Sequence, residues 1–189
     1  MAVALVWLAG VAGGFGILWR YAAARGADTR APASWPAETR LARASDRATL
    51  LVFVHPRCSC TRATLAELGK LLQRVPGRVD ATVVLVRPDG LPAGWERGEL
   101  SAMAERAGAR TVEDPAGAEA TRFGAETSGA TLLYAADGRL EFAGGLTSVR
   151  GHEGDSLGQE RIVALLTGGR ADRPDSPVFG CPLINKEAR

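Results

Sequence analysis

The stretch that most constrains the fold is residues 49–62, TLLVFVHPRCSCTR, where a short apolar run is followed by a proline and two cysteines one residue apart. An apolar run of this length is typical of a strand buried on both faces of a sheet. Beyond the cysteines, leucine and valine recur at helical spacing through residues 61–75, and a Pro-Gly pair then ends the pattern. The sequence therefore predicts a buried strand that leads through a cysteine pair into an amphipathic helix.

The rest of this part of the chain repeats the same alternation. Residues 81–86 predict a second buried strand, and residues 96–107 predict a helix. Residues 114–124 are expected to form a turn with a short helical piece. Residues 131–135 and 140–143 flank Asp137-Gly138, a strong hairpin signal, and residues 157–166 predict a last helix. This order indicates an α/β sandwich in which helices cover both faces of a mixed sheet.

The N-terminus has the composition of a membrane segment. Its first 19 residues contain no charged side chain and are followed by Arg20, Tyr21 and Arg25. A helix of this length covers about 28 Å, close to the ~30 Å hydrocarbon core of a bilayer. We expect residues 1–21 to form a transmembrane anchor. A cleaved signal peptide is the alternative, although no basic residue precedes the apolar stretch.

The remaining boundaries follow from composition. Residues 22–48 are rich in Ala, Arg and Pro, and we expect them to form a linker that leads away from the bilayer. We expect residues 49–169 to form the globular domain. Residues 170–189 contain three prolines and one cysteine and are expected to form an extended tail, either laid over the domain or left free.

Charge and cysteine content exclude two classes of protein. The formal net charge of +2 and the even spread of the arginines give no basic stripe, so we expect no nucleic-acid partner. Three cysteines are too few for a disulfide-stapled scaffold. Cysteine chemistry in this chain should therefore belong to a site.

Three motifs carry a resemblance to a known family. LVFVHPRCSCTRATLAEL (residues 51–68), VEDPAGAEATRFGA (112–125) and ATLLYAADGRLEFAGG (130–145) together resemble the TlpA-type, membrane-anchored branch of the thioredoxin-like superfamily. The Cys-x-Cys site combined with the glycine-rich loop GGLTSVRGHEGD (144–155) is similar to RedB-like proteins. The resemblance implies a thioredoxin-like three-layer sandwich behind an N-terminal transmembrane helix. It also implies an enzyme that exchanges thiols and disulfides with partner proteins, with no cofactor and no metal ion.

The chain departs from the family pattern in two places. Family members usually have Cys-x-x-Cys, and on that pattern Cys58 takes the first position while Thr61 stands where the second cysteine should be. The residue before the third predicted strand is usually a cis-proline that faces the cysteines and helps to hold a substrate peptide, whereas this chain has Ala130. A cis peptide bond without proline costs about 2.5 to 4 kcal/mol. We therefore expect substrate to be held differently.

The predicted catalytic residues are Cys58 as the nucleophile and Cys60 as the resolving thiol. A thiolate is the attacking species, and a helix N-terminus stabilises the anion. Arg57 and Arg62 add positive charge, and His55 is a candidate proton acceptor. Residues i and i+2 point to nearly opposite sides of a regular helix, so Cys58 must lie before the first turn if the two are to bond. A disulfide that spans one residue closes a tight ring, and strain in such a ring makes the disulfide easier to reduce. We therefore expect an oxidising or isomerising couple.

Other interpretations of the cysteines stay open. Cys58 and Cys60, together with His55, His152 or Cys181, could bind Cu(I), since thiolates select that ion, and the protein would then be a metallochaperone. A thioredoxin-like domain that only binds a partner is another possibility, and simple burial of both thiols is a third. Cys181 is either a third redox partner, if the tail folds back over Cys58, or a free thiol. For His152, in the glycine-rich loop, we favour a structural role.

Two features give opposite expectations for localisation. The arginines that follow the apolar span favour a cytoplasmic domain by the positive-inside rule. Persistent disulfide chemistry and the family resemblance favour the other side of the membrane. We adopt the second expectation, a single-pass protein of the cell membrane whose domain lies on the periplasmic or extracytoplasmic side.

Overall fold

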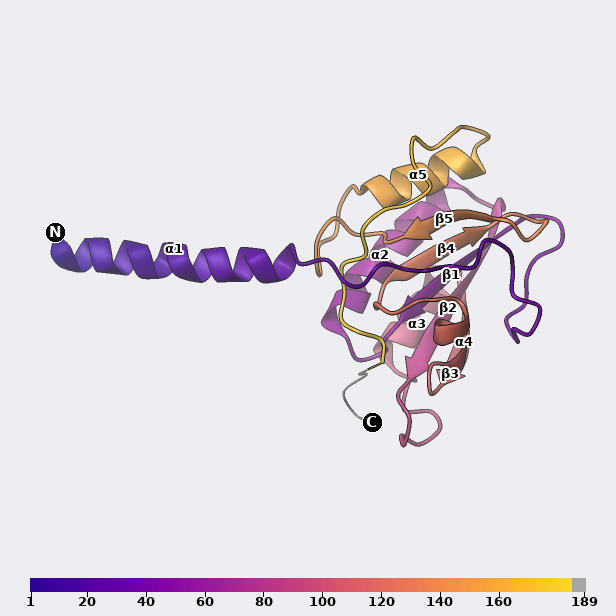
Figure 1. The fold of residues 1–189 in the computed structure, drawn as a ribbon, viewed down its shortest axis with the longest axis horizontal. Coiled ribbons are helices and arrows are strands. Elements are labelled where there is room, and N and C mark those ends of the chain that lie inside the picture. The colour runs from indigo at the N-terminus through magenta and orange to yellow at the C-terminus, as the bar shows by residue number, and fades with distance from the viewer. Residues whose placement is uncertain (185–189) are drawn as a thin grey trace.

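The computed structural model of the chain describes residues 1–184, and its centre is a mixed five-stranded sheet in the order β3-β2-β1-β4-β5 (Figure 1). β1 (Ala48–Val54) pairs in parallel with β2 (Val79–Arg87), which pairs in parallel with β3 (Arg110–Pro115). On its other side β1 is antiparallel to β4 (Ala130–Tyr134), which forms a hairpin with β5 (Leu140–Gly144). The helices of the domain are α2 (Ser59–Arg74), α3 (Glu99–Arg106), α4 (Ala118–Arg122) and α5 (Leu157–Leu166).

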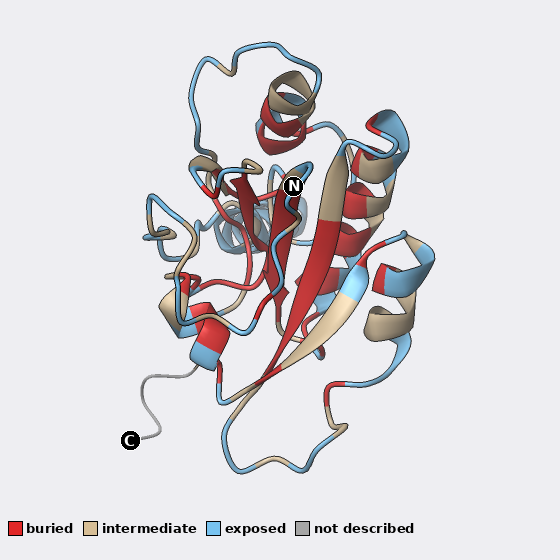
Figure 2. Ribbon diagram, turned by 90° about the vertical axis from the view of Figure 1, so that its right-hand side faces the viewer, coloured by how far each residue is buried: buried red, intermediate tan, exposed pale blue. Residues whose placement is uncertain are grey.

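The central strand is buried on both faces because its side chains alternate between two cores (Figure 2). Leu50 and Val52 pack into a core that contains residues of α2, α3 and α5. Leu51 and Phe53 pack on the opposite face with Phe123, which directly follows α4. This confirms the predicted mixed sheet with helices on both faces.

The sequence predicts four of the five strands, and the one it does not predict is β3. Its six residues, RTVEDP, include one large apolar side chain, Val112, and only Asp114 among them is buried. An edge strand of this kind can stay partly solvated, so it lacks the apolar run that marks the central strands.

Helix α1 (Ala2–Ala22) extends away from the domain, and none of its residues is buried (Figure 1). Its length and composition would allow it to cross a membrane. A signal sequence near the N-terminus has the same properties.

The residues after α1, which the sequence predicts as a linker, lie along the domain in the structure. The Gly26 N–H donates to Val178 O (2.8 Å), and the Trp35 N–H donates to Gly138 O (2.8 Å). The Trp35 ring packs edge-on against Phe123 and Tyr134, with ring centroids 5.3 Å and 5.2 Å away. Partial burial of this ring and backbone pairing of residues 33–35 with residues 138–140 of the β4–β5 hairpin explain why the segment follows the domain surface.

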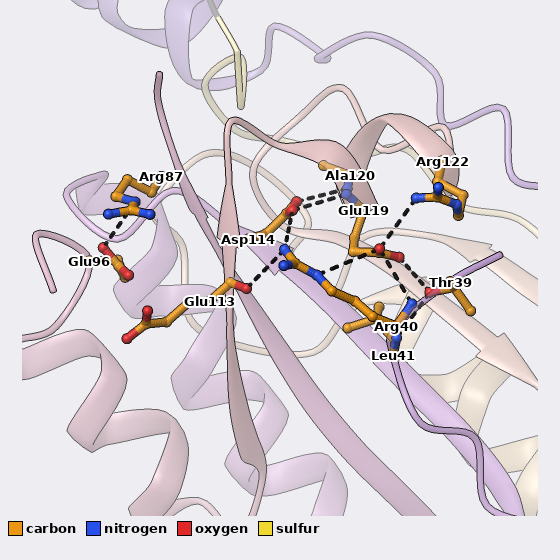
Figure 3. A network of polar contacts seen from close by, with 10 residues as sticks. All are labelled: Thr39, Arg40, Leu41, Arg87, Glu96, Glu113, Asp114, Glu119, Ala120 and Arg122. Atoms are coloured by element: carbon orange, nitrogen blue, oxygen red, sulfur yellow. Dashed lines mark hydrogen bonds and ion pairs between the residues drawn. The ribbon is translucent and has the colours of Figure 1, made fainter. Parts of the chain in front are cut away.

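A polar network fastens the same segment to α4 (Figure 3). Both carboxylate oxygens of the buried Asp114 accept backbone N–H groups at the start of α4, from Glu119 and Ala120, each at 2.9 Å. Arg40 donates to Asp114 Oδ1 (3.3 Å), and its Nε lies 3.7 Å from Glu119 Oε1. Asp114 therefore caps the helix while Arg40 joins it to the residues before β1.

The tail also lies on the domain, crossing the segment that follows α1 (Figure 1). The Ala143 N–H of β5 donates to Pro174 O (3.0 Å), and the Ser176 N–H donates back to Ala143 O (3.3 Å). Further along, Val178, Phe179 and Leu183 are buried. Of the two arrangements predicted for residues 170–189, the tail laid over the domain is the one observed as far as residue 184.

Candidate functional site

Cys58 and Cys60 lie where β1 gives way to α2. Cys58 is the N-cap of α2, with extended backbone angles of φ −91° and ψ 127°, and Cys60 lies in the first turn. A turn between His55 and Cys58, closed by the Cys58 N–H donating to His55 O (3.1 Å), brings the chain from strand to helix. Cys58 therefore precedes the helix, which meets the geometric condition for a bond with Cys60. Both side chains are buried, each 7 % exposed.

A third thiol completes the site. The tail presents Cys181, so that the sulfur atoms of Cys58, Cys60 and Cys181 all lie within 4.8 Å of one another. The tail is held there by strand-like pairing with the residues before β4. The Ser128 N–H donates to Cys181 O (2.8 Å), and the Leu183 N–H donates to Glu126 O (2.9 Å). Which of its two predicted roles Cys181 plays is not apparent from the sequence, but the structure places it against the pair.

Of the three thiols, Cys58 is the one whose pKa is lowered. Burial raises the pKa of Cys58, but hydrogen bonds from the Cys181 thiol and from the backbone and thiol of Cys60 outweigh it, so the pKa lies below the usual range. Burial and the negative charge on Cys58 raise the pKa of Cys60 to about 11. Burial and the hydrogen bond donated to Cys58 also raise the pKa of Cys181. Cys58 thus becomes the thiolate first, while its two neighbours remain donors.

Arg150, a residue that the sequence does not single out, brings positive charge to the thiols. Arg150 Nη1 donates to Cys181 Sγ (3.8 Å), and its charge acts to lower the pKa values of both Cys60 and Cys181. The same residue contacts the end of α1, since its N–H donates to Ala22 O (3.0 Å) and its Nε to Ala24 O (3.2 Å). A lone arginine in a glycine-rich loop carries no sequence signal for this role.

The two arginines proposed from sequence are engaged elsewhere. Arg62 forms a two-point ion pair with Glu99, at 2.8 Å and 2.9 Å, on the exposed surface. The Arg57 guanidinium lies over the Trp95 ring, 4.6 Å from its centroid. A cleft of about 470 Å³ next to Cys58 is lined by these four side chains, among others.

The histidines lie outside the group of three thiols. His55 Nδ1 accepts the Arg57 N–H (3.3 Å), and its ring packs edge-on against Trp95. Burial and the charge of Arg57 lower the pKa of His55, so its neutral form is favoured. His152 is exposed in the loop before α5, whose N-terminus is capped by Ser156.

Of the two residues that depart from the family pattern, Thr61 makes hydrogen bonds beside the site and Ala130 begins a strand. The Thr61 hydroxyl donates to His55 O (3.0 Å) and shares a hydrogen bond with Ser128 Oγ (3.1 Å). Ala130 is fully buried and begins β4, and the peptide bonds of the described residues are all trans. Ser128, two residues before Ala130, is the residue that holds the backbone of Cys181.

Comparison with known proteins identifies the fold. No protein-family model matches the chain, and no curated protein matches it by sequence. An uncharacterized conserved protein from Geobacillus kaustophilus superposes with a TM-score of 0.62 at 19 % identity, over 88 % of this chain and 95 % of that one. A hypothetical protein from Sinorhizobium meliloti gives a TM-score of 0.59 at 17 % identity, over 85 % and 93 %.

A third structure that superposes on this chain is a thioredoxin-like protein. It was solved in solution in its oxidized form and gives a TM-score of 0.53 at 14 % identity, over 76 % of this chain and 97 % of that one. This chain has a thioredoxin-like fold. The predicted thioredoxin-like fold is therefore confirmed. The Cys58 and Cys60 pair lies at the start of α2, and an apolar N-terminal helix precedes the domain.

Proposed function

We propose that this protein is a membrane-anchored thiol–disulfide oxidoreductase of the TlpA-type, RedB-like kind, with Cys58 as nucleophile and Cys60 as resolving thiol. The observation that carries the proposal is the position of Cys58. It caps α2 in a thioredoxin-like fold and accepts hydrogen bonds from two other thiols, an arrangement that favours its thiolate. Protein thiols or disulfides are the proposed substrates, and no cofactor is required.

The exchange proceeds in two steps. The Cys58 thiolate attacks one sulfur of a partner disulfide, which forms a mixed disulfide and releases the other partner sulfur as a thiolate. Cys60 then loses its proton and attacks Cys58 Sγ, which forms the Cys58–Cys60 bond and releases the second partner thiolate. The partner gains two electrons and this protein loses them; oxidation of a partner is the reverse sequence. The tight Cys-x-Cys ring favours that reverse, oxidising direction or isomerisation.

The proposed location is the extracytoplasmic side of the cell membrane, with α1 as a single-pass anchor. The length and composition of α1 and the oxidising conditions that disulfides need support this location. Arg20 and Arg25, which follow the apolar stretch, favour the opposite side under the positive-inside rule. Disulfide chemistry imposes the stronger requirement, since the charge rule is statistical.

The test uses the full chain in detergent and follows disulfide exchange with a model protein substrate. Cys58→Ser should abolish turnover, because no other thiol at the site is readily ionised. Cys60→Ser combined with Cys181→Ser, which removes both thiols that lie beside Cys58, should accumulate the mixed disulfide with the substrate, detected by mass. Ser148→Ala, an exposed substitution in the loop before α5, is the matched control and should keep normal turnover. Normal turnover in Cys58→Ser would rule out the mechanism.

One observation favours a second candidate, a Cu(I)-binding protein. Three sulfur atoms within 4.8 Å of one another form a donor set that suits Cu(I), which prefers thiolate ligands. Anaerobic titration of the reduced full chain with Cu(I) would then show stoichiometric uptake that is lost in both Cys58→Ser and Cys60→Ser. Turnover of disulfides that persists in the presence of a Cu(I) chelator would favour the oxidoreductase instead. Loss of both properties would leave a thioredoxin-like binding domain.

A further inference from the structure

Residues 181–183 of the tail occupy a backbone edge beside the thiols. They pair antiparallel with residues 126–128, through the hydrogen bonds of Cys181 and Leu183 described above and a bridge between Thr127 and Pro182. Buried apolar side chains at Val178, Phe179 and Leu183 hold the tail on both sides of Cys181. The position of Cys181 next to Cys58 is therefore fixed by a tail segment that pairs with the domain as a strand does.

The fit between the two segments is close enough to require glycine at the residue before Cys181. A methyl group at Gly180 would lie 1.9 Å from Ser128 O, a backbone atom that has no freedom to move aside. Arg150 supplies a further contact, from its guanidinium to Cys181 Sγ. The tail thus has a fixed register against the site.

We infer that Cys181 is a third redox residue and that the stable oxidised form of the protein carries a Cys58–Cys181 disulfide, which fastens the tail over the site. This inference rests on the proposed thiol–disulfide activity. A bridge between Cys58 and Cys60 closes a tight ring, whereas Cys58 and Cys181 belong to segments that already lie side by side. A bridge between residues far apart in sequence also restricts the unfolded chain more strongly.

The transfer is an isomerisation within the oxidised protein. Cys181 loses its proton to solvent and attacks Cys58 Sγ of the Cys58–Cys60 disulfide. The Cys58–Cys181 bond forms, the Cys58–Cys60 bond breaks, and Cys60 leaves as a thiolate that takes up a proton. No electrons enter or leave the protein in this step. A partner thiol then reopens the site by attacking the new bridge.

The experiment maps disulfides in the full chain, held in detergent and equilibrated in glutathione buffers of stepped potential. Acid quenching, alkylation of free thiols and trypsin digestion separate CSCTR (residues 58–62) from the peptide that contains Cys181. We expect the two peptides to be linked in most of the oxidised protein, with the bond on Cys58. Cys181→Ser should leave only the bridge inside CSCTR, and Cys60→Ser should still link the two peptides.

A pair of glycine substitutions tests the role of tail docking without removing a thiol. Gly180→Ala should lower the ratio of linked to unlinked CSCTR at least tenfold. Gly69→Ala, where the added methyl group would meet Ala107 at an ordinary 3.5 Å, should match the wild type. Circular dichroism of both variants checks that the domain remains folded.

Several results would overturn the inference. One is an alkylated, unbridged Cys181 at every potential at which Cys58 and Cys60 are bridged. A dominant Cys60–Cys181 bond, or a Gly180→Ala variant with the wild-type ratio, would do the same. Failure of the proposed function gives a different pattern, in which Cys58 bonds to neither cysteine and exchange is absent from every variant.

Discussion

The reactivity of Cys58 depends on its two neighbouring thiols more than on any charged side chain. Among the effects that lower its pKa, the hydrogen bond from Cys181 is the largest, followed by contacts with Cys60. Burial acts in the opposite direction, so the net shift depends on these donors. The effect of removing one donor on the pKa of Cys58 should therefore be measurable in a variant that keeps Cys58 itself.

We predict that Cys58 reacts with iodoacetamide at a lower pH than an ordinary cysteine. The thiolate is the reacting species, so a lowered pKa moves the midpoint of the rate against pH downward. Cys181→Ala should move that midpoint upward, because the variant loses the main stabilising donor. The measurement follows alkylation of CSCTR by mass, with Ser148→Ala as control. An unchanged or lower midpoint in Cys181→Ala would contradict this account.

Single residues differ in how far sequence alone predicts them. Cys58 and Cys60 are evident because they interrupt a strand-to-helix junction, where packing alone gives no reason for two thiols. Cys181 and Arg150 are not evident from the sequence, because the tail and the loop that bring them to the cysteine pair make contacts between segments distant in sequence. Arg57 and Arg62 are expected at the site, but Trp95 and Glu99 engage them.

At the scale of elements, Glu67 joins α2 to α5 and to the loop before it. This carboxylate is 1 % exposed, accepts the Gly154 N–H (2.7 Å) and the side-chain amide of Gln159, and pairs with Lys70 (2.7 Å). No apolar residue at this position could satisfy these donors.

We predict that Glu67→Ala lowers the free energy of unfolding by about 3 kcal/mol, because it leaves buried donors without acceptors and opens a cavity. Urea denaturation of the full chain at pH 7 measures it. Glu105→Ala removes an exposed carboxylate that accepts only the Thr111 hydroxyl among the hydrogen bonds described, and should cost less than about 1 kcal/mol. Equal effects in the two variants would show that the Glu67 network contributes little.

A second element-scale prediction concerns the cap of α4. Asp114→Ala should destabilise the protein by about 2 kcal/mol, since two helix N–H groups lose their acceptor and Arg40 loses a partner. Thermal unfolding followed by circular dichroism gives the comparison. Asp89→Ala, which removes an exposed turn carboxylate bonded to Gly90, is the matched control. A Tm for Asp114→Ala within a degree of that control would be the contrary result.

The elements themselves divide by how strongly burial shapes their sequences. β1, β2, α2 and α5 carry apolar patterns because the core covers them, and all four are predicted within two residues of their observed bounds. The β4–β5 hairpin is predicted through its Asp-Gly turn. β3 is not predicted, because an edge strand with charged side chains resembles a loop in composition.

For the molecule as a whole, the main prediction is its orientation in the membrane. A reporter that is active only outside the cytoplasm, fused to the C-terminus of the full chain, should be active, because the proposed disulfide chemistry requires an oxidising compartment. A reporter that is active only in the cytoplasm, fused at the same point, is the matched control and should be silent. The reverse pattern at normal expression would place the domain inside and agree with the arginines that follow α1.

The segment after α1 and the tail are joined by contacts across the domain, which the sequence does not predict. The segment after α1 contacts the tail through Gly26 and Val178, and Arg150 contacts both the end of α1 and Cys181. These contacts connect residues that lack any local pattern. The prediction of a linker that leads away from the bilayer used composition alone, which carries no information about such pairing.

The order of synthesis gives the tail one further consequence. The ribosome makes Cys58 and Cys60 before most of the domain, and Cys181 only after α5. Until then, of the three cysteines, only Cys58 and Cys60 can bond to each other within the nascent chain, in a ring that spans one residue. The emerging polypeptide therefore passes through a stage at which its cysteines are open to oxidation and to foreign thiols, and docking of the tail closes that window.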